Sequence, residues 1–235
     1  MSAELQRMAH LRRVYFQTRY LLQIAREVWL TDRVEMNDRS HREQEWDFAS
    51  GPDKDRWERV LALVTARLGE RWGDVLEIGC AEGVITAQLA PRAQTLVAGD
   101  ISPIARERTA DRLKGAGHVR VVPLDLQRDS LDAFDVVFAM DVLEFVHGGR
   151  RVRHTIGKLA GSVRPGGLLV VSMCRYPADI HDAWWQRWVP EGADRIIPMI
   201  AADPAFEQLH REPHPAGGQP IPGYLDHLIA LFRRK

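Results

Sequence analysis

The sequence predicts an α/β protein built around a doubly wound, mainly parallel sheet. From residue 75 onward, apolar runs typical of strands alternate with helical patterns, which is typical of βαβ units. The first apolar run, 75–78, is followed by a turn of small residues at 79–83 and a helical pattern from Val84. This layout is typical of a first strand, a cofactor turn and a helix N-terminus. The 235 residues suffice for one large α/β domain with additions and are few for two full domains.

The composition is that of an ordinary soluble globular protein, with 45% hydrophobic and 27% charged residues. Lys+Arg and Asp+Glu both number 32, so no net charge favours nucleic acid or an anionic membrane as a partner. The two cysteines, Cys80 and Cys174, form no disulfide framework and favour a reducing compartment. The sequence has no signal-peptide core and no apolar run of membrane-spanning length. We therefore expect a cytoplasmic protein.

Residues 1–70 are predicted to form a helical extension or lid, and residues 71–235 the cofactor-binding domain. Residues 1–36 show a helical pattern, 37–51 a polar and irregular one, and 53–68 a second helix that Gly69 ends. The first helix is expected to dock on its own domain or on a second subunit, which would make a homodimer; a membrane-surface helix is the alternative. Its apolar face comprises Leu5, Met8, Leu11, Tyr15, Leu22, Ala25 and Trp29.

The remaining elements follow from apolar runs and turn residues. Strands are predicted at 75–78, 95–98, 119–124, 134–140 and 168–172, and helices at 84–89, 103–114 and 150–163. Two late strands, 206–210 and 225–232, flank a Pro/Gly loop, and with no helix between them we expect antiparallel neighbours. Residues 176–200 are rich in Trp and Arg and show no strand alternation.

The first turn favours a ligand without phosphate. Gly79 and Gly83 have a Gly-x-x-x-Gly spacing, and Ala81 stands where the dinucleotide fingerprint needs a second glycine close to a pyrophosphate. Glu82 would also place a negative charge near phosphates. Both features disfavour NAD and suit a ligand held by a ribose and an ammonium group. The alternative is a plain strand-to-helix turn whose glycines allow tight packing.

Two further strand ends offer groups that suit a nucleoside. Asp100 follows the second strand and is placed to accept hydrogen bonds from two ribose hydroxyls. The alternative is that it caps the next helix, a role open equally to Ser102. Asp125 follows the third strand, where its carboxylate can accept from an exocyclic amine while Leu126 covers a flat base; simple turn chemistry is the alternative. Three strand ends in series thus match the parts of one nucleoside.

Five stretches resemble the successive motifs of class I S-adenosylmethionine-dependent methyltransferases. They are 75–83, 97–103, 123–126, 134–146 and 164–172. Within that superfamily, 76–83 and 192–194 with Ile196 and Ile197 are similar to the NodS-like group, whose members methylate an amine on a chito-oligosaccharide. The resemblance covers about residues 44–235. It implies a Rossmann-like seven-stranded sheet of order 3-2-1-4-5-7-6 with strand 7 antiparallel.

The resemblance also implies which residues hold S-adenosyl-L-methionine. Met140 would lie near the sulfonium, and Trp57, with Trp46 and Phe48, would close over the cofactor or pack within an N-terminal lid. The methionine moiety would be held by Glu77 and the turn residues Gly79, Cys80, Ala81 and Gly83, the ribose by Asp100, and the adenine by Ile101, Asp125 and Leu126.

The acceptor side is less defined. Methyl transfer from a sulfonium requires alignment and exclusion of water, and a hydroxyl acceptor also needs a base. Asp141, Glu144 and His147 would share a face towards the cofactor if 141–147 is helical. The alternative for Glu144 and His147 is a solvated or purely structural role. Tyr176, His181, Trp184 and Trp185 would line an acceptor pocket or belong to the core.

The predicted function is S-adenosylmethionine-dependent methyl transfer to a nitrogen or oxygen of a small molecule or amino sugar, with S-adenosyl-L-homocysteine as product. The alternatives are a methyltransferase-fold binding module without turnover and a nucleotide-dependent oxidoreductase. Nucleic acid is disfavoured as a substrate, because Met140-Asp141-Val142 replaces the Asn/Asp-Pro-Pro-aromatic motif that serves a flipped base. No metal is predicted, since His147, His154, Cys174 and His181 lack zinc-ligand spacing.

Overall fold

The computed structural model describes residues 32–43, 51–175, 192–215 and 226–235, together with the helical residues 11, 14, 15, 17–19, 21, 22 and 25. Several residues named from the sequence lie outside the described residues: Leu5, Met8, Trp29, Trp46, Phe48, Tyr176, His181, Trp184 and Trp185. Among the described residues of the first helix, Leu11, Tyr15 and Leu22 are exposed.

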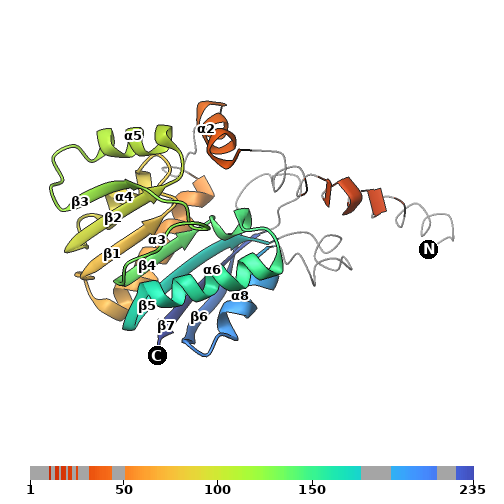
Figure 1. The fold of residues 1–235 in the computed structure, drawn as a ribbon. Coiled ribbons are helices and arrows are strands. Elements are labelled where there is room, and N and C mark those ends of the chain that lie inside the picture. The colour runs from red at the N-terminus through yellow and green to blue at the C-terminus, as the bar shows by residue number, and fades with distance from the viewer. Residues whose placement is uncertain are drawn as a thin grey trace.

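The described residues form a seven-stranded sheet of order β3-β2-β1-β4-β5-β7-β6 (Figure 1). β7 pairs antiparallel with both β5 and β6, and the other pairings are parallel. The predicted fold class, strand order and antiparallel seventh strand are therefore confirmed. The strands are β1 Asp74–Ile78, β2 Thr95–Asp100, β3 Val119–Pro123, β4 Phe134–Met140, β5 Val163–Cys174, β6 Phe206–Pro215 and β7 Asp226–Arg234.

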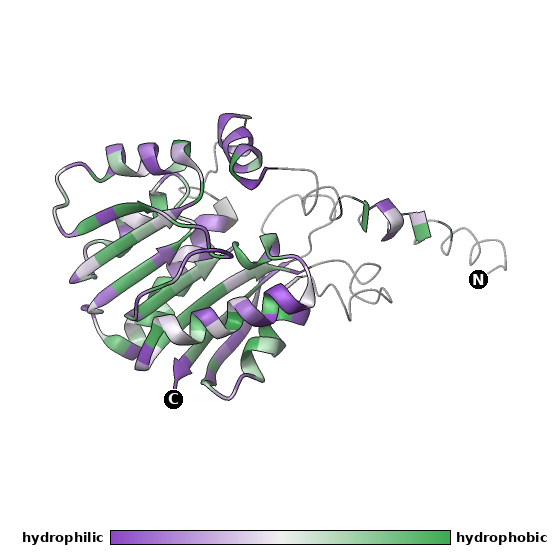
Figure 2. Cartoon of the chain, in the orientation of Figure 1, coloured by the Kyte–Doolittle hydropathy of each residue, from purple (hydrophilic) through white to green (hydrophobic). Residues whose placement is uncertain are grey.

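Helices cover both faces of the sheet, so its central strands are apolar on both sides (Figure 2). On one face, α3 (Gly51–Leu68) and α4 (Val84–Leu89) pack against the sheet. On the other lie α6 (Gly149–Ser162), α8 (Ala193–Ala201) and the 3-10 turn η1 (Leu143–Phe145). α2 (Arg33–Glu43) lies against α5 (Pro103–Arg112). Since α3 shares the sheet's core, residues 51–68 fold with the sheet; the domain division at residue 70 stays a prediction.

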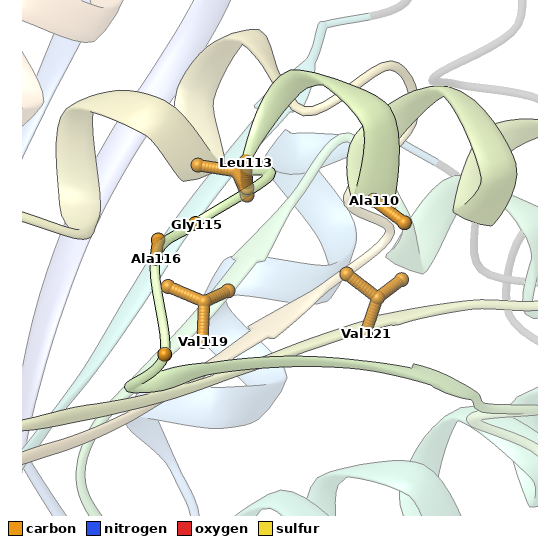
Figure 3. Close-up of a pocket in the computed structure, with 7 residues that line it drawn as sticks. Ala110, Leu113, Gly115, Ala116, Val119 and Val121 are labelled. Carbon is orange, nitrogen blue, oxygen red and sulfur yellow. The ribbon is translucent and has the colours of Figure 1, made fainter.

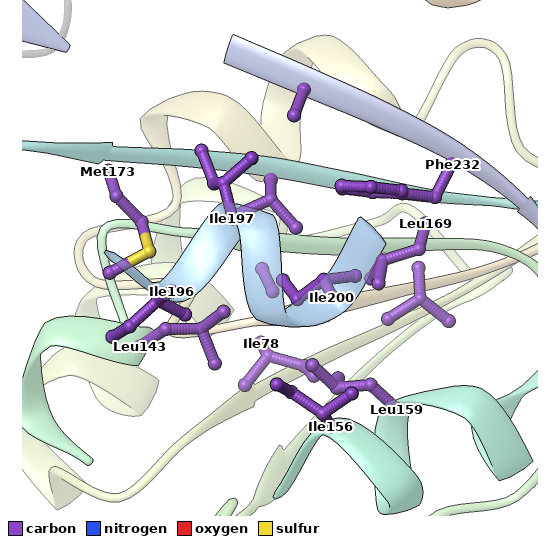
Figure 4. Close-up of a cluster of buried hydrophobic side chains, with 14 of the residues drawn as sticks. Ile78, Leu143, Ile156, Leu159, Leu169, Met173, Ile196, Ile197, Ile200 and Phe232 are labelled. Atoms are coloured by element: carbon purple, nitrogen blue, oxygen red, sulfur yellow. The ribbon is translucent and has the colours of Figure 1, made fainter. Parts of the chain in front are cut away.

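The alternation of side chains along each strand sets which residues reach which face. In β5, Leu168 and Val170 join the cluster under α3, whereas Leu169, Val171 and Met173 join the cluster under α6 and α8. Figure 4 shows the second cluster, where Ile196, Ile197 and Ile200 of α8 lie among Met173, Leu169 and Phe232. By the same alternation, Ser172 and Cys174 belong to the face that α3 covers.

Residues 37–43 and the whole of α8 are helical where the sequence predicted no helix. Residues 37–43, expected to be irregular, belong to α2, which begins where Asp32 Oδ1 accepts from Val34 N (2.8 Å). Few apolar residues mark this helix, because its buried side chains Asp38 and His41 are polar. α8 lies in the stretch read only as lacking strand alternation, and its isoleucines at 196, 197 and 200 have the helical spacing of a buried face.

The two outer strands of the sheet are β3 and β6. β6 carries Glu207, Arg211 and Pro213, all exposed. No helix of the described residues is both long and apolar enough to cross a bilayer.

Candidate active site

The turn after β1 is shaped by close approaches of neighbouring segments. Gly79, Ala81 and Gly83 have φ of 79°, 46° and 74°, so Ala81 takes a left-handed conformation without the freedom of glycine. A Cβ on Gly79 would lie 2.3 Å from Val142 Cγ1, and one on Gly83 would lie 2.9 Å from Thr109 Cα. Both glycines are therefore required by packing at this turn, which matches the alternative weighed for them.

Asp100 ends β2 with its carboxylate held by the backbone. Its Oδ2 accepts from Ala81 N (3.0 Å) and its Oδ1 from Ser102 N (2.8 Å), and the residue is 7% exposed. Ser102 Oγ accepts from Ala105 N (3.1 Å), so Ser102 caps α5. Burial raises the pKa of Asp100. The carboxylate thus joins the first turn to the end of β2 and keeps lone pairs for a ligand.

Glu77 is a carboxyl group buried within β1, 3% exposed. Its Oε2 has no hydrogen-bond partner among the described residues. Burial raises the pKa of Glu77 to about 8. A buried carboxyl group in this condition suits a cationic ligand group, which would pair with the ionised form.

Asp125 is engaged by α2. Arg33 Nη1 donates to its Oδ1 (3.0 Å) and Nη2 to its Oδ2 (2.5 Å), a bidentate pair. Burial alone would raise the pKa of Asp125, but the hydrogen bonds from Arg33 and from Gln127 N outweigh it and lower the pKa. A second contact, from Ser102 Oγ to Asp38, holds α2 over the end of β2.

A cavity of about 760 Å³ lies beneath α2, within the usual size of small-molecule sites. Three residues singled out from the sequence line it: Ile101, Asp125 and His147. The wall of the cavity also includes Arg33 and Met36 of α2 and Phe145 of η1. The structure therefore brings these residues together around one cavity, although their roles stay predictions.

The region predicted to face the acceptor is organised by Arg56 of α3, whose side chain is 2% exposed. Its Nη1 donates to Asp141 Oδ1 (2.8 Å) and to Ser172 Oγ (2.9 Å), and its Nη2 to Asp53 Oδ1 (2.8 Å). Burial alone would lower the pKa of Arg56, but Asp141 and Asp53 raise it, so the guanidinium stays charged. Asp141 itself has a positive φ of 52°, a strained conformation that directs its carboxylate towards Arg56.

Cys174 and His227 lie beside Asp141. They are directly opposed residues of β5 and β7, with Cys174 Sγ 3.0 Å from His227 Nε2. His227 Nε2 is 3.7 Å from Asp141 Oδ1. Burial lowers the pKa of His227, although Asp141 opposes this, and burial, Glu144 and Asp141 raise the pKa of the Cys174 thiol. The imidazole and the thiol are therefore both neutral near pH 7.

The other predicted residues are distributed as follows. Three predicted cofactor residues, Leu126, Met140 and Trp57, are buried within the hydrophobic clusters, each 8% exposed or less. Cys80 is also buried, and its Sγ accepts from Thr109 Oγ1 at 3.6 Å. Of the three acceptor-side candidates, Asp141 and Glu144 both act electrostatically on Cys174, whereas His147 lines the cavity with Asp125. His147 therefore lies in the wall of the 760 Å³ cavity and is separate from Asp141 and Glu144. The catalytic roles of all three residues stay predictions.

Sequence reasoning missed Arg33, Arg56 and His227. Arg56 carried a usable signal, because it lies beside Trp57 and one turn before Val60, within the apolar stripe of α3. Arg33 and His227 carried none, since their partners are distant in the sequence.

A smaller hollow lies between the end of α5 and β3 (Figure 3). It has a volume of about 370 Å³ and is lined by alanine, leucine, glycine and valine residues between 110 and 121. Since none of these side chains is titratable, this hollow offers no catalytic group.

A family model described as nodulation protein S (NodS) matches residues 37–205. Nodulation protein S of Rhizobium tropici is 34% identical over 129 residues, which make up 54% of this chain and 52% of the relative. That of Bradyrhizobium diazoefficiens is 32% identical over 153 residues, 63% of this chain and 70% of the relative. The chain thus spans about half the length of the first of these relatives.

Among solved structures, the N-methyltransferase NodS from Bradyrhizobium japonicum WM9 in complex with S-adenosyl-L-homocysteine has a TM-score of 0.73 and 25% identity. The alignment covers 86% of this chain and 99% of that one. This neighbour agrees with the observed fold, and the family model covers more than half of the chain. The chain belongs to the nodulation protein S (NodS) family.

Proposed function

We propose that this protein transfers a methyl group from S-adenosyl-L-methionine to a nitrogen or oxygen of a small molecule or amino sugar. The observation that carries the proposal is the set of carboxyl groups at three neighbouring strand ends, Glu77, Asp100 and Asp125, in a chain of the NodS family. The relative solved with S-adenosyl-L-homocysteine supports this choice of cofactor.

In this proposal the cofactor supplies an electrophilic methyl group on its sulfonium. Glu77, buried and without a partner for its Oε2 among the described residues, pairs with the ammonium group. Asp100, fixed by two backbone N–H groups, accepts from the ribose hydroxyls. Asp125 and Ile101 face the adenine from the wall of the 760 Å³ cavity.

The chain's main catalytic tasks are then alignment and exclusion of water. Asp141 and Glu144 lie on the acceptor side. Asp141 is paired with Arg56 and keeps lone pairs that can accept a hydrogen bond from an amine acceptor. An amine there needs only to lose one proton before it attacks, whereas a hydroxyl acceptor needs a dedicated base. We assign His147 to the wall of the 760 Å³ cavity and not to the acceptor side.

Calorimetry with S-adenosyl-L-homocysteine tests the cofactor half. We expect the wild-type chain to bind it and Asp100→Asn to bind it roughly 10- to 150-fold more weakly, as for loss of about 1.5–3 kcal/mol from hydrogen bonds to a charged group. Asp132→Asn, a change at an exposed carboxylate, is the control and should leave the affinity unchanged. Absent binding, or equal binding by Asp100→Asn and the wild type, contradicts the proposal.

A pair of chito-oligosaccharides tests the acceptor. We expect chitotetraose with one free amine to gain a methyl group by mass spectrometry, and the fully N-acetylated form, which offers only hydroxyls, to gain none. Methylation of both would indicate oxygen as the acceptor atom. Cofactor binding without turnover on amine and hydroxyl panels would instead indicate a binding module.

A further inference from the structure

Three side chains with metal-binding chemistry meet at the carboxyl ends of β4 and β5. Cys174 Sγ is 3.0 Å from His227 Nε2, which is 3.7 Å from Asp141 Oδ1. One ligand atom from each residue lies within 4.8 Å of the others. In a tetrahedral zinc site with bonds of about 2.0–2.3 Å, neighbouring ligand atoms lie roughly 3.3–3.8 Å apart. The three side chains are therefore close to the spacing that one small cation needs.

The fold fixes these three residues from distant parts of the chain. Cys174 and His227 are cross-strand partners at one end of the β5–β7 ladder. Asp141 follows β4, where its N–H donates to Ser172 O (2.8 Å) and its positive φ directs the carboxylate into the same region. Such local strain is typical of functional positions. Because the ligands are not close in sequence, zinc-ligand spacing could not reveal them.

The surrounding charges are compatible with a divalent cation. One thiolate and one carboxylate balance the two positive charges of the ion, and Arg56 is balanced by Asp53. Arg56 Nη1 reaches both oxygens of Asp141, at 2.8 Å and 2.6 Å, yet a carboxylate has about four lone-pair positions and so keeps one on each oxygen. Arg56 thereby orients the carboxylate, as hydrogen-bond partners of metal ligands do.

We propose that Asp141, Cys174 and His227 bind a single zinc-class ion at the acceptor side of the site, with its fourth position open. A mixed set of sulfur, nitrogen and oxygen donors suits Zn²⁺ and disfavours Mg²⁺ and Ca²⁺, which prefer oxygen. On binding, the S–H bond of Cys174 breaks and its proton passes to solvent, while His227 provides a ring-nitrogen lone pair. No group is oxidised or reduced. The site goes beyond the proposed methyl transfer and does not depend on it.

Cobalt titration of the full-length, chelator-treated protein tests the proposal, because Co²⁺ bound by a thiolate shows a sulfur-to-metal charge-transfer band. We expect one Co²⁺ per chain with this band, and its displacement by Zn²⁺. Cys174→Ala and His227→Ala should each lower the zinc affinity at least about 100-fold, since loss of an outer partner alone costs 10–100-fold. Cys80→Ala, which removes the other cysteine, is the control and should keep the band.

Circular dichroism of each variant reports whether it folds, and the band of the wild-type chain gives a result even if a variant does not. Absence of the band at one equivalent of Co²⁺, or an unchanged zinc affinity in folded Cys174→Ala, would mean an adventitious ion only and overturn the proposal. Calorimetry with S-adenosyl-L-homocysteine on the same samples reports separately on the proposed function. Cofactor binding without metal binding would refute the metal site alone.

Discussion

The two halves of the site are held together by different kinds of contact. At the ends of β1 and β2, the Asp100 carboxylate accepts from backbone N–H groups only 19 and 2 residues away. At the ends of β4 and β5, side chains bind side chains across long intervals: Arg56 reaches Asp141 over 85 residues and Ser172 over 116, and Cys174 reaches His227 over 53. The carboxylate that joins β1 to β2 is therefore held by contacts close in sequence, whereas the second half is specified only by the completed sheet.

If the second half depends on side-chain pairs, Arg56→Met should cause the largest loss of stability towards unfolding. This change leaves the half-buried Asp141, whose side chain is 21% exposed, without its counter-charge. We expect a loss of about 2–3 kcal/mol, below the roughly 3–5 kcal/mol for breaking a fully buried ion pair. Urea denaturation measures the loss. Arg59→Met, one turn along the same helix, removes an exposed pair with Glu212 and should change little. An equal decrease in the free energy of unfolding of both variants would show that the ion pairs of Arg56 stabilise the fold no more than an exposed pair does.

The first half can be probed through the pH dependence contributed by Glu77. Because its folded-state pKa is about 8, above that of an unfolded glutamate near 4.5, its neutral form stabilises the apoprotein fully below about pH 4.5. That contribution is lost as the pH rises through 8. Glu77→Gln should therefore melt increasingly above the wild type between pH 5 and pH 8, while losing cofactor affinity.

Calorimetry in buffers of different ionisation enthalpy gives a second measure for Glu77. An ammonium group beside the carboxyl lowers its pKa again, so cofactor binding near pH 7 should release a proton from the wild type and none from Glu77→Gln. Proton release of equal size in both proteins would place the ammonium group elsewhere.

A smaller effect is expected where α2 closes over the first half. Arg33→Gln removes the bidentate pair with Asp125 and should cost about 1 kcal/mol at pH 7, since both side chains are partly exposed. The pKa of Asp125 is lowered in the folded state, so this stabilisation is present above about pH 4 and disappears as the pH falls through the lowered value. Arg42→Gln, an exposed change on the same helix, is the control in urea titrations at pH 7.

The smallest effect should come from Ala81→Gly. Glycine relieves about 1 kcal/mol of left-handed strain at φ 46° but costs roughly 0.4–1 kcal/mol through the unfolded chain, so stability should be nearly unchanged. Ala87→Gly, inside the neighbouring helix α4, should destabilise by about 1 kcal/mol. Thermal unfolding compares the two. A large loss in Ala81→Gly would mean that its methyl group has contacts that matter more than the strain.

The sequence predicted the sheet well because each strand can be recognised from its own apolar residues. Residues 134–140 form an apolar run interrupted only by Asp135, and the observed β4 has those bounds. Gly79, Asp100 and Asp125 were recognisable because each follows such a run directly. Residues 37–43 of α2 were missed because the buried residues Asp38 and His41 are polar and pair with other segments.

The partners of Asp141, namely Arg56 and His227, escaped prediction for a different physical reason. Cys174 and His227 are neighbours only because β7 runs antiparallel to β5 in one register, and that register depends on the whole sheet. The positive charge of Arg56 predicts a solvent-exposed side chain, whereas its position in the apolar stripe of α3 predicts a buried one. A hydropathy pattern does not predict that such a charged residue is buried, because the partner that permits its burial is distant in the sequence.

Pro213 lies on the outer strand β6 and affects whether the folded protein can pair this edge with a strand of another molecule. An outer strand offers unpaired N–H and C=O groups that can recruit a strand from a neighbouring molecule. Proline supplies no N–H, and the charges of Glu207 and Arg211 oppose close stacking of sheets. This edge is thereby protected against intermolecular strand addition, and so against the growth of aggregates at high concentration.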